Sequence, residues 1–428
     1  MLDDKRLRVG KVDRGAAGHG DFFLRFAAEI LLRRRCMRDV VILSATRTPI
    51  GAFQGALAGV PAPRLGAVAI RGAVAQARID PSDVTDVLMG NVLQAGLGQA
   101  PARQAAIYGG LPPTVRTVTV HKVCGSGLQA VWQAGQSLSL GDAGFVVAGG
   151  MENMSAAPYL LPKGREGFRL GNQTMLDSII HDGLWDPYGQ IHMGNCAEQC
   201  AQRYGFTRAQ QDAFAAESFR RANAAQADGR LAAEITPVEI TDAKGGVRFV
   251  ERDEGPAKVN YDRMPTLRPA FDPKGTITAA NASSINDAAA ALVLCQGATA
   301  SARGLKPLAR IVAMAGHAQE PLWFTTAPIV AAGKALERAG WSAADVDLWE
   351  VNEAFAVVAL AFMQELKLSP GKVNIRGGAI ALGHPIGCSG ARILVTLLAA
   401  LRERGLKRGV ATICIGGGEA LAACVELI

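Results

Sequence analysis

A cysteine followed by a glycine-rich turn opens a predicted helix in the first third of the chain. The run Cys124-Gly125-Ser126-Gly127 lies between a predicted strand over 117–120 and a predicted helix over 128–140. Unpaired N–H groups at a helix N-terminus favour thiolate over thiol, so we expect a lowered pKa and a nucleophilic Cys124. The flanking glycines would let backbone amides approach a reacting carbonyl. A small buried cysteine in a tight turn is the alternative interpretation.

A second glycine-dense run, residues 377–390, contains His384, one of only six histidines in the chain. It leads into a predicted helix over 391–401. A histidine in such a loop is placed to act as the base that ionises a cysteine supplied by another part of the chain. A histidine that only bonds a loop carbonyl would give the same pattern.

Two further residues at the ends of predicted strands could take part in the same chemistry. Cys414 ends a strand over 410–415 and runs into Gly416 and two more glycines, which would present a second thiol and free amide donors. Buried cysteines in strands are common, so this signal alone is weak. Asn352 follows a strand over 348–351 and could hold a water or an oxyanion, or could simply cap the next helix.

His192, Cys196 and Cys200 are spaced four residues apart, a spacing that could suggest a metal site. On one helix these residues would span roughly 12 Å at a 1.5 Å rise per residue, so one metal ion could not contact both ends. The chain also lacks a GxxxxGK[ST] element and a dinucleotide-binding fingerprint. We therefore predict no metal and no cofactor.

Short β-branched runs alternate with alanine-rich helical stretches from residue 38 onward, which predicts an α/β fold. The sequence also contains an internal repeat. Residues 83–91 resemble 345–352, and Ser126-Gly127 with its helix and strand resembles Ser389-Gly390 with the elements that follow it. Two matches in the same order suggest that the halves are copies of one layered unit.

Residues of about 155–280, between the two halves, carry more prolines, charges and polar stretches than the rest of the chain. This composition predicts an inserted lobe of helices and loops that governs substrate specificity. Residues 1–37 lack a clear pattern, and we interpret them as an unstructured extension or the result of an early start codon. A transit peptide is the alternative, although its several acidic residues argue against one.

The composition limits the possible partners. The 45 basic and 38 acidic residues of the 428-residue chain give a formal charge of +7, which is too diffuse to indicate a nucleic-acid surface. No apolar run reaches the roughly 18 residues needed to cross a bilayer. The eight cysteines form no compact framework and are interpreted as free thiols in a reducing compartment. We predict a cytoplasmic protein that binds neither nucleic acid nor membrane.

Taken together, the motifs resemble the thiolase family over about residues 38–428. The resemblance rests on six motifs in the right order: VCGSGLQA (123–130), HMG (192–194), NASSIND (281–287), NEAF (352–355), GGAIALGHPIG (377–387) and CIGGG (414–418). Within the family, TAANAS, WEVNEAF and KVNIRGGAIALGHPIG most resemble acetoacetyl-CoA thiolases, which are also called acetyl-CoA acetyltransferases.

The resemblance implies a duplicated five-layered α-β-α-β-α architecture, with an N-terminal half over 38–300 that includes the inserted lobe and a C-terminal half over 301–428. It implies an acyltransferase that condenses two acetyl-CoA molecules into acetoacetyl-CoA and CoA through an acetyl-cysteine. Thiolases are generally dimers or tetramers, so it also implies a homo-oligomer, and we expect a homotetramer.

The same resemblance assigns residue roles. Cys124 would be the nucleophile, His384 its activating base and Cys414 the base that removes a proton from the second acetyl-CoA. One oxyanion would be held by His384 with a water on Asn352, and the other by the amides of Cys124 and Gly416. The residues expected to contact coenzyme A are His192, Met193, Ser283 and Phe355.

Three other functions remain open at this stage. A 3-oxoacyl-CoA thiolase of fatty-acid breakdown would use the same chemistry with a longer pocket, although bulky Trp323 and Phe324 are expected to shorten it. A decarboxylating condensing enzyme usually has a histidine where this chain has Asn352, and lacks the second cysteine. A CoA- or lipid-binding relative without catalysis is the third.

The chain also departs from the family pattern at two places. Cys388 is a third thiol in the histidine loop, which could add sensitivity to oxidation. Some acetoacetyl-CoA thiolases bind potassium with help from a tyrosine, but Pro256 is aligned near that position and Tyr261 follows several residues later. Potassium is therefore left out of the prediction.

Overall fold

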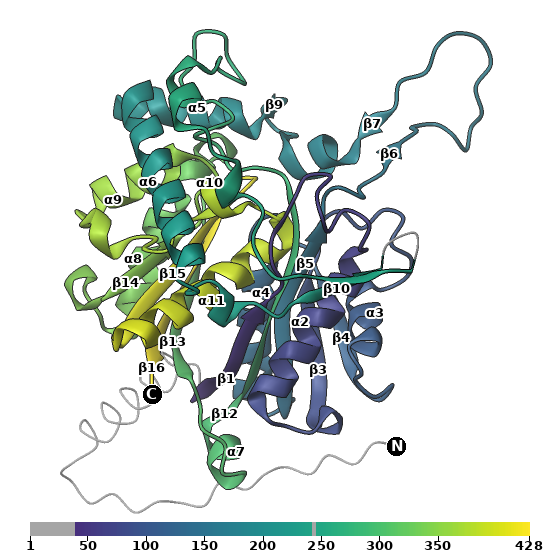
Figure 1. The fold of residues 1–428 in the computed structure, drawn as a ribbon, viewed down its shortest axis with the longest axis vertical. Coiled ribbons are helices and arrows are strands. Elements are labelled where there is room, and N and C mark those ends of the chain that lie inside the picture. The colour runs from purple at the N-terminus through teal and green to yellow at the C-terminus, as the bar shows by residue number, and fades with distance from the viewer. Residues whose placement is uncertain (1–38, 242–244) are drawn as a thin grey trace, which may run out of the picture. The chain divides into compact units, whose positions relative to one another are not determined.

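The computed structural model describes residues 39–241 and 245–428 (Figure 1). The prediction for residues 1–37 lies outside the described residues. No helix within the two described ranges is long and apolar enough to span a membrane.

The core of the molecule is a mixed sheet that contains both halves of the chain. Its strands run in the order β14-β15-β16-β13-β1-β12-β5-β3-β4, and β2 pairs with β12. The two halves join where β1 lies antiparallel to β13. The strands are β1 (Val40–Arg47), β2 (Gly51–Ala52), β3 (Val84–Gly90), β4 (Arg116–Val120), β5 (Phe145–Asn153), β12 (Asn286–Gln296), β13 (Ala309–Ala318), β14 (Leu348–Val351), β15 (Arg408–Ile415) and β16 (Glu419–Leu427).

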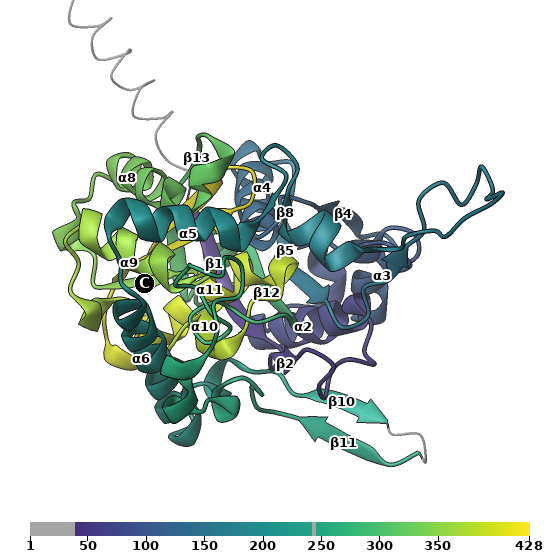
Figure 2. The ribbon, with the colours of Figure 1, turned by 90° about the horizontal axis from the view of Figure 1, so that it is seen from above.

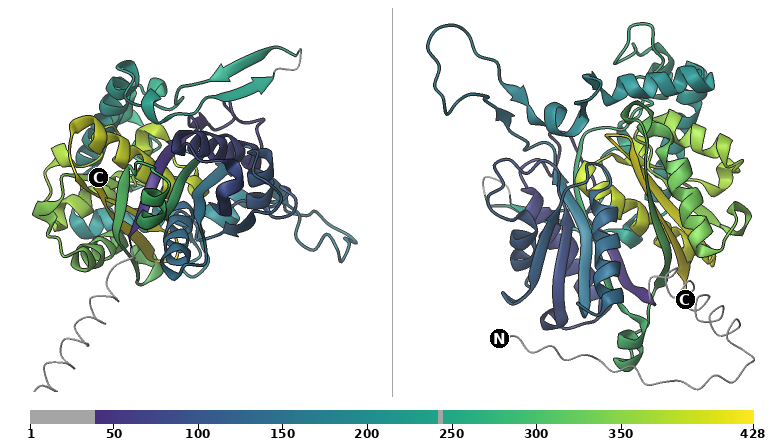
Figure 3. Two further views of the ribbon diagram at one scale, coloured as in Figure 1. Left: turned by 90° about the horizontal axis from the view of Figure 1, so that it is seen from below. Right: turned by 180° about the vertical axis from the view of Figure 1, so that it is seen from behind.

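Helices lie on both faces of each half of this sheet. The helices α2 (Ala62–Ala77) and α3 (Pro101–Tyr108) cover the outer face of the first half. On the outer face of the second half lie α8 (Ala327–Ala339) and α9 (Ala356–Glu365). The helices α4 (Ser126–Leu140) and α11 (Ile386–Arg404) pack against each other between the two halves (Figure 3). The predicted five-layered α-β-α-β-α architecture is confirmed.

The predicted duplication is visible in the topology. In the first half β3 lies parallel to β5, and in the second half β14 lies parallel to β15. The matched glycines are where the two central helices touch. A Cβ on Gly127 would lie 2.7 Å from the Ala391 nitrogen, and one on Gly390 would lie 2.5 Å from the Leu128 nitrogen. Any larger residue at either position would push α4 and α11 apart.

The segment between β5 and β12 leaves the main sheet and forms the inserted lobe (Figure 2). Its helices α5 and α6 contact α9, an element of the second half, so the insertion packs across the molecule. The domain boundaries near residue 300 stay a prediction. The lobe contains α5 (Met193–Tyr204), α6 (Arg208–Ala227), β6 (Tyr159–Leu160) with β7 (Leu176–Asp177), β8 (Trp185–Asp186) with β9 (Ile191–His192), and β10 (Val238–Thr241) with β11 (Val247–Val250).

Some element boundaries differ from the sequence-based expectation. The helices α4 and α11 begin at Ser126 and Ile386, whereas 128 and 391 were predicted. Glycine and serine are poor helix formers, but here their small size allows close helix packing, and packing outweighs propensity. The suggestion that Asn352 caps a helix is wrong, because α9 begins at Ala356 after the cap residue Phe355.

Candidate active site

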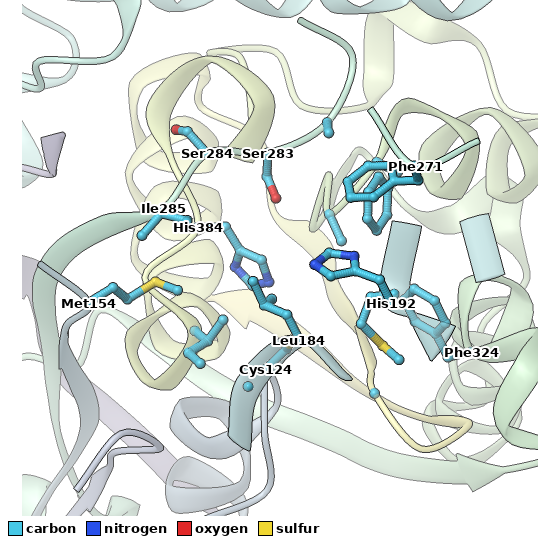
Figure 4. Close-up of a pocket in the computed structure, with 17 residues that line it drawn as sticks. Cys124, Met154, Leu184, His192, Phe271, Ser283, Ser284, Ile285, Phe324 and His384 are labelled. Carbon is cyan, nitrogen blue, oxygen red and sulfur yellow. The ribbon is translucent and has the colours of Figure 1, made fainter. Parts of the chain in front are cut away.

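A cavity of about 230 Å³ brings together residues from both halves and from the inserted lobe (Figure 4). The first half contributes Cys124, the second half contributes His384 and Gly416, and the lobe contributes His192. The remaining wall is mainly apolar. This mixture of a mostly apolar lining with a few converging polar groups is typical of a small-molecule site.

Cys124 lies two residues before the first residue of α4, and its sulfur accepts backbone N–H groups from Gly416 and from Cys124 itself. Burial, with a smaller contribution from the Glu152 carboxylate, nevertheless raises the pKa of the thiol to about 11. The expected lowering of this pKa is wrong, because the loss of water around the sulfur outweighs the amide donors. The resting group is a thiol that needs a base.

The backbone beside the nucleophile is strained. Val123 has a φ of +43°, a left-handed conformation that β-branched residues rarely adopt. The strain is maintained by the surrounding turn, in which the Ser126 hydroxyl donates to the Val123 carbonyl at 2.7 Å and accepts the Lys122 amide at 2.8 Å. Ser126 therefore fixes the turn that carries Cys124.

The raised pKa predicts how the free enzyme reacts with iodoacetamide. Below its pKa, a thiol gains about tenfold in thiolate per pH unit, and the thiolate is the nucleophile. Alkylation of Cys124, followed by peptide mass spectrometry, is expected to accelerate steadily from pH 6 to pH 9. A rate that levels off near pH 7 would show that the thiol is already ionised and would contradict this assignment.

His384 is held as a neutral base. Its Nδ1 lies 2.6 Å from the Ser389 hydroxyl, which itself donates to the Pro385 carbonyl at 2.9 Å. With its proton committed to that carbonyl, the Ser389 oxygen accepts from Nδ1–H, which leaves the other ring nitrogen, Nε2, unprotonated. Burial, with a contribution from the Arg392 charge, lowers the pKa of His384 to about 3, so the ring is neutral at physiological pH.

Asn352 and Cys414 lie directly behind the cavity rather than on its wall. The Asn352 Nδ2 is 3.5 Å from the His384 Nε2, and its buried Oδ1 has no hydrogen-bond partner among the described residues. Cys414 is fully buried beside Met193 and Phe355. Burial raises the pKa of Cys414, and so does the neighbouring Cys124 sulfur, which places the two thiols in one electrostatic environment.

The four residues expected to contact coenzyme A all line the cavity. His192 caps α5 by accepting the Gly194 amide on Nδ1 at 3.0 Å, and its ring stacks on Phe271 with centroids 4.7 Å apart. Because Nδ1 accepts, the neutral ring carries its proton on Nε2, where it can donate. Figure 4 shows His192 and His384 facing each other across the cavity. The other three are Met193, Ser283 and Phe355.

The two bulky residues expected near the acyl group have different positions. Phe324 lines the cavity and packs edge-on against Phe355, with centroids 6.5 Å apart. Trp323 does not line it, and instead Arg203 lies over its ring. Of these two residues, only Phe324 therefore forms part of the cavity wall.

A second cavity of about 690 Å³ adjoins the first and shares Phe271 and residues 282–285 with it. Its wall includes the exposed cations Lys258 and Arg263. The Cys124 cavity and a cavity with two exposed cations in the inserted lobe therefore lie against the same residues. That length and charge suit a long substrate with an anionic end.

Several site residues have no distinctive sequence signal. Met154, Leu184 and Ile285 line the cavity as ordinary apolar side chains. Ser389 could have been noticed because it lies five residues after His384, in the first turn of α11. The suggested oxidation sensitivity of Cys388 is wrong, since that residue is fully buried and its surroundings raise the pKa of its thiol to about 12.

Known proteins resemble this chain in both sequence and fold. The family model for the thiolase N-terminal domain matches residues 40–298, and that for the thiolase C-terminal domain matches residues 305–427. The acetyl-CoA acetyltransferase of Cupriavidus necator is 52% identical over 391 residues, covering 91% of this chain and 100% of that protein. The acetyl-CoA acetyltransferase of Pseudomonas aeruginosa is 50% identical, covering 90% of this chain and 98% of that protein.

A solved structure agrees with these sequence matches. The crystal structure of the Bacillus anthracis acetyl-CoA acetyltransferase superposes with a TM-score of 0.89 at 39% identity, covering 92% of this chain and 100% of that one. The fold, the cavity with its cysteine and histidine, and the matches to both domain models agree, and the chain belongs to the thiolase family.

Proposed function

We propose that this protein is an acetyl-CoA C-acetyltransferase, which joins two acetyl-CoA molecules into acetoacetyl-CoA and CoA and also catalyses the reverse thiolysis. Relatives at about 50% identity bear that name. The structural observation that carries the proposal is that Cys124, the Nε2 of His384 and the Gly416 amide meet at one cavity. Nucleophile, base and oxyanion donor are the three parts that acyl transfer needs.

In the first half-reaction, the neutral His384 takes the proton of Cys124, and the thiolate attacks the carbonyl carbon of acetyl-CoA. The tetrahedral oxyanion is stabilised by the backbone amides of Cys124 and Gly416, which already point at the sulfur. The thioester bond to CoA breaks, and the departing sulfur takes a proton from Cys414. Acetyl-Cys124, a Cys414 thiolate and protonated His384 remain.

In the second half-reaction, the Cys414 thiolate removes a proton from the methyl carbon of a second acetyl-CoA. The enolate oxygen is stabilised by His384 and by a water held on Asn352, whose Oδ1 has no other partner among the described residues. The enolate carbon attacks the acetyl group, and the bond to the Cys124 sulfur breaks. Cys124 recovers its proton from His384, so all three groups return to their starting states.

This scheme requires no metal or organic cofactor, because the chain itself supplies the nucleophile and both bases. A cytoplasmic location remains part of the proposal. We also propose a homo-oligomer, and a homotetramer in particular. The segment around β6 and β7, which projects from the molecule (Figure 1), exposes Tyr159, Leu161, Leu170 and Met175, which is an unusual density of apolar surface for a monomer. Light scattering of the purified chain would measure the assembly directly.

The cavity predicts a preference for the shortest substrate. Phe324, Phe355 and Leu184 close it around the acyl group, and each methylene that does not fit costs on the order of tenfold in kcat/KM. Cleavage of acetoacetyl-CoA by CoA, followed by loss of substrate absorbance, is expected to be at least tenfold faster than cleavage of 3-oxohexanoyl-CoA. Faster cleavage of the longer ester would keep the chemistry and change the substrate, and no cleavage of either would overturn the proposal.

The charged rim of the second cavity predicts where the phosphates of coenzyme A bind. Lys258 and Arg263 are exposed cations on the wall of that cavity and do not line the cavity that contains Cys124. Removing either is expected to raise the KM for CoA by about tenfold with kcat nearly unchanged, because a charge-assisted hydrogen bond contributes roughly 1.5–3 kcal/mol.

The matched control for these two changes is Lys306→Ala, which removes an exposed cation from the wall of a different cavity. Steady-state kinetics of Lys258→Ala, Arg263→Ala and Lys306→Ala would compare them. Equal KM values in all three would place the phosphates elsewhere.

A further inference from the structure

Glu152 is a fully buried carboxylate in β5 that takes no part in the chemistry described above. Its Oε1 accepts the Asn91 Nδ2 at 2.7 Å and the Leu93 amide at 3.1 Å. Its Oε2 accepts the Val92 amide at 3.0 Å and the Gly387 amide at 2.9 Å. An ionised carboxylate has about four acceptor sites, so these donors saturate it.

The four donors come from opposite halves of the molecule. Asn91, Val92 and Leu93 follow β3 in the first half, and Val92 and Leu93 pack with Met154 and Ile386 beside the active-site cavity. Gly387 is in the first turn of α11 in the second half. Glu152 therefore links the part of the first half that borders the cavity to the helix that follows His384.

The α11 N-terminus lacks a cap of its own. Its cap residue is Pro385, whose side chain accepts no hydrogen bond, and its first turn has no acidic residue. A helix start leaves unsatisfied N–H groups and a partial positive charge, which a carboxylate stabilises. Glu152 supplies that carboxylate, and no salt bridge of Glu152 is found within residues 39–241 and 245–428.

The contact between Glu152 and Gly387 leaves no space for a side chain. A Cβ on Gly387 would lie 2.6 Å from the Glu152 Oε2 and 2.9 Å from the Asn91 Cα. The Gly387 carbonyl in turn fits against β5 so closely that a Cβ on Gly150 would lie 2.1 Å from it. The start of α11 is thus fixed in position, and His384 lies just before it.

We propose that Glu152 is a positioning residue for acyl transfer. Its carboxylate caps α11 from the other half of the molecule and thereby keeps the His384 ring at the distance and orientation needed to accept the Cys124 proton. This inference rests on the proposed function, because it concerns the geometry between the base and the nucleophile. Glu152 touches neither substrate nor the reacting sulfur. Its effect on the reaction comes through the Gly387 amide and the loop that precedes it.

The substitution Glu152→Gln tests this role at nearly constant shape. One carboxylate oxygen becomes an NH₂ group, which would face two N–H donors and repel them, so the cap on α11 is weakened. A displacement of about 1 Å between reacting groups can cost about 10²-fold in rate. We expect kcat for acetoacetyl-CoA thiolysis to fall between about tenfold and 10²-fold, with the KM for CoA changed less than about threefold.

Alkylation of Cys124 is a second measurement, and it responds to the charge of Glu152 rather than to the position of His384. Burial raises the pKa of Glu152 to about 7, so its carboxyl group is ionised at pH 9. Its charge then raises the pKa of Cys124, so removing that charge is expected to lower the Cys124 pKa and make alkylation by iodoacetamide faster at pH 9. The other titratable groups near this thiol, His384 and Cys414, are unchanged in the variant. Faster alkylation of Cys124 with unchanged alkylation of the buried Cys295 would separate the charge effect from general destabilisation, which would expose both thiols.

The matched control is Glu234→Gln, which alters another fully buried carboxylate. Glu234 pairs with Arg47 and lines a cavity that contains neither Cys124 nor His384, so its loss is expected to lower the melting temperature without a selective fall in kcat. If Glu152→Gln fails to fold, Asn91→Ala removes one of the four donors and is expected to show a smaller change of the same kind.

The outcomes are distinct. A lower kcat with an unchanged KM and faster alkylation in Glu152→Gln supports the inference. Equal kcat values in Glu152→Gln and Glu234→Gln, or a change in KM alone, would overturn it. Wild-type protein that does not cleave acetoacetyl-CoA would instead refute the proposed function, and the alkylation comparison would still measure the effect of Glu152 on Cys124.

Discussion

Replacing Cys124 by serine is expected to lower the turnover of acetoacetyl-CoA by on the order of 10⁴-fold or more, the size of loss seen when a covalent nucleophile is removed. A serine hydroxyl is far less acidic than a thiol, and His384 is a weak base because burial lowers its pKa to about 3. The base therefore cannot ionise the hydroxyl effectively. Steady-state thiolysis, assayed with acetoacetyl-CoA and CoA, measures this loss.

The control for this change is Cys295→Ala, which removes a buried thiol from β12, where it packs in the apolar core. That variant is expected to keep kcat within about threefold of wild type, because it loses packing atoms and no reacting group. If Cys124→Ser retained a tenth of wild-type turnover, Cys124 would not be the nucleophile. Loss of activity in both variants would point to unfolding, which a thermal melt would reveal.

Replacing Cys414 by alanine is expected to separate the two half-reactions. Removing the base that deprotonates the second acetyl-CoA should lower condensation and thiolysis by about 10²–10⁴-fold, the usual contribution of a general base. The acetyl group can still move between CoA and Cys124, because protonated His384 can return its proton to the departing CoA sulfur in place of Cys414, and the Gly416 amide is untouched. Exchange of labelled CoA into acetyl-CoA should therefore persist while acetoacetyl-CoA is neither made nor cleaved.

This selective loss distinguishes Cys414 from Cys124, whose substitution should stop exchange and condensation together. Cys414 is fully buried behind the cavity, so alanine leaves a small void and a modest fall in stability. An equal loss of exchange and condensation in Cys414→Ala would show that acetyl transfer to Cys124 depends on Cys414 as much as the second half-reaction does, and would contradict the scheme.

Much of the fold could be predicted from sequence because it depends on local pattern and repetition. The echo between residues 83–91 and 345–352 anticipated that β3 and β14 occupy matching places in the two halves. The first residues of α4 and α11 could not be predicted from sequence. Both helices begin with serine or glycine residues, and α11 follows a proline, so helix propensity alone assigns these positions to loops. Contact between the two helices makes these positions helical.

Site residues could be predicted where a reactive side chain lies in an unusual local sequence. Cys124 and His384 have unusual glycine-rich surroundings, and the structure brings them to one cavity. The pKa of Cys124 was not predictable, because the sulfur is enclosed by segments far away in the sequence, including Gly416. Glu152 could have been recognised from the sequence, because it is the only charged residue in the apolar run that forms the buried strand β5.

The central claim is that an acetyl group passes through Cys124. The most direct measurement is to incubate Cys414→Ala with acetyl-CoA, quench it with acid, digest it and locate the acetyl group by mass spectrometry. We expect one acetyl group per chain, on the peptide that contains Cys124, and its removal when CoA is added before the quench. An acetyl group on another residue, or no acetyl group in a folded protein, would contradict the proposed mechanism.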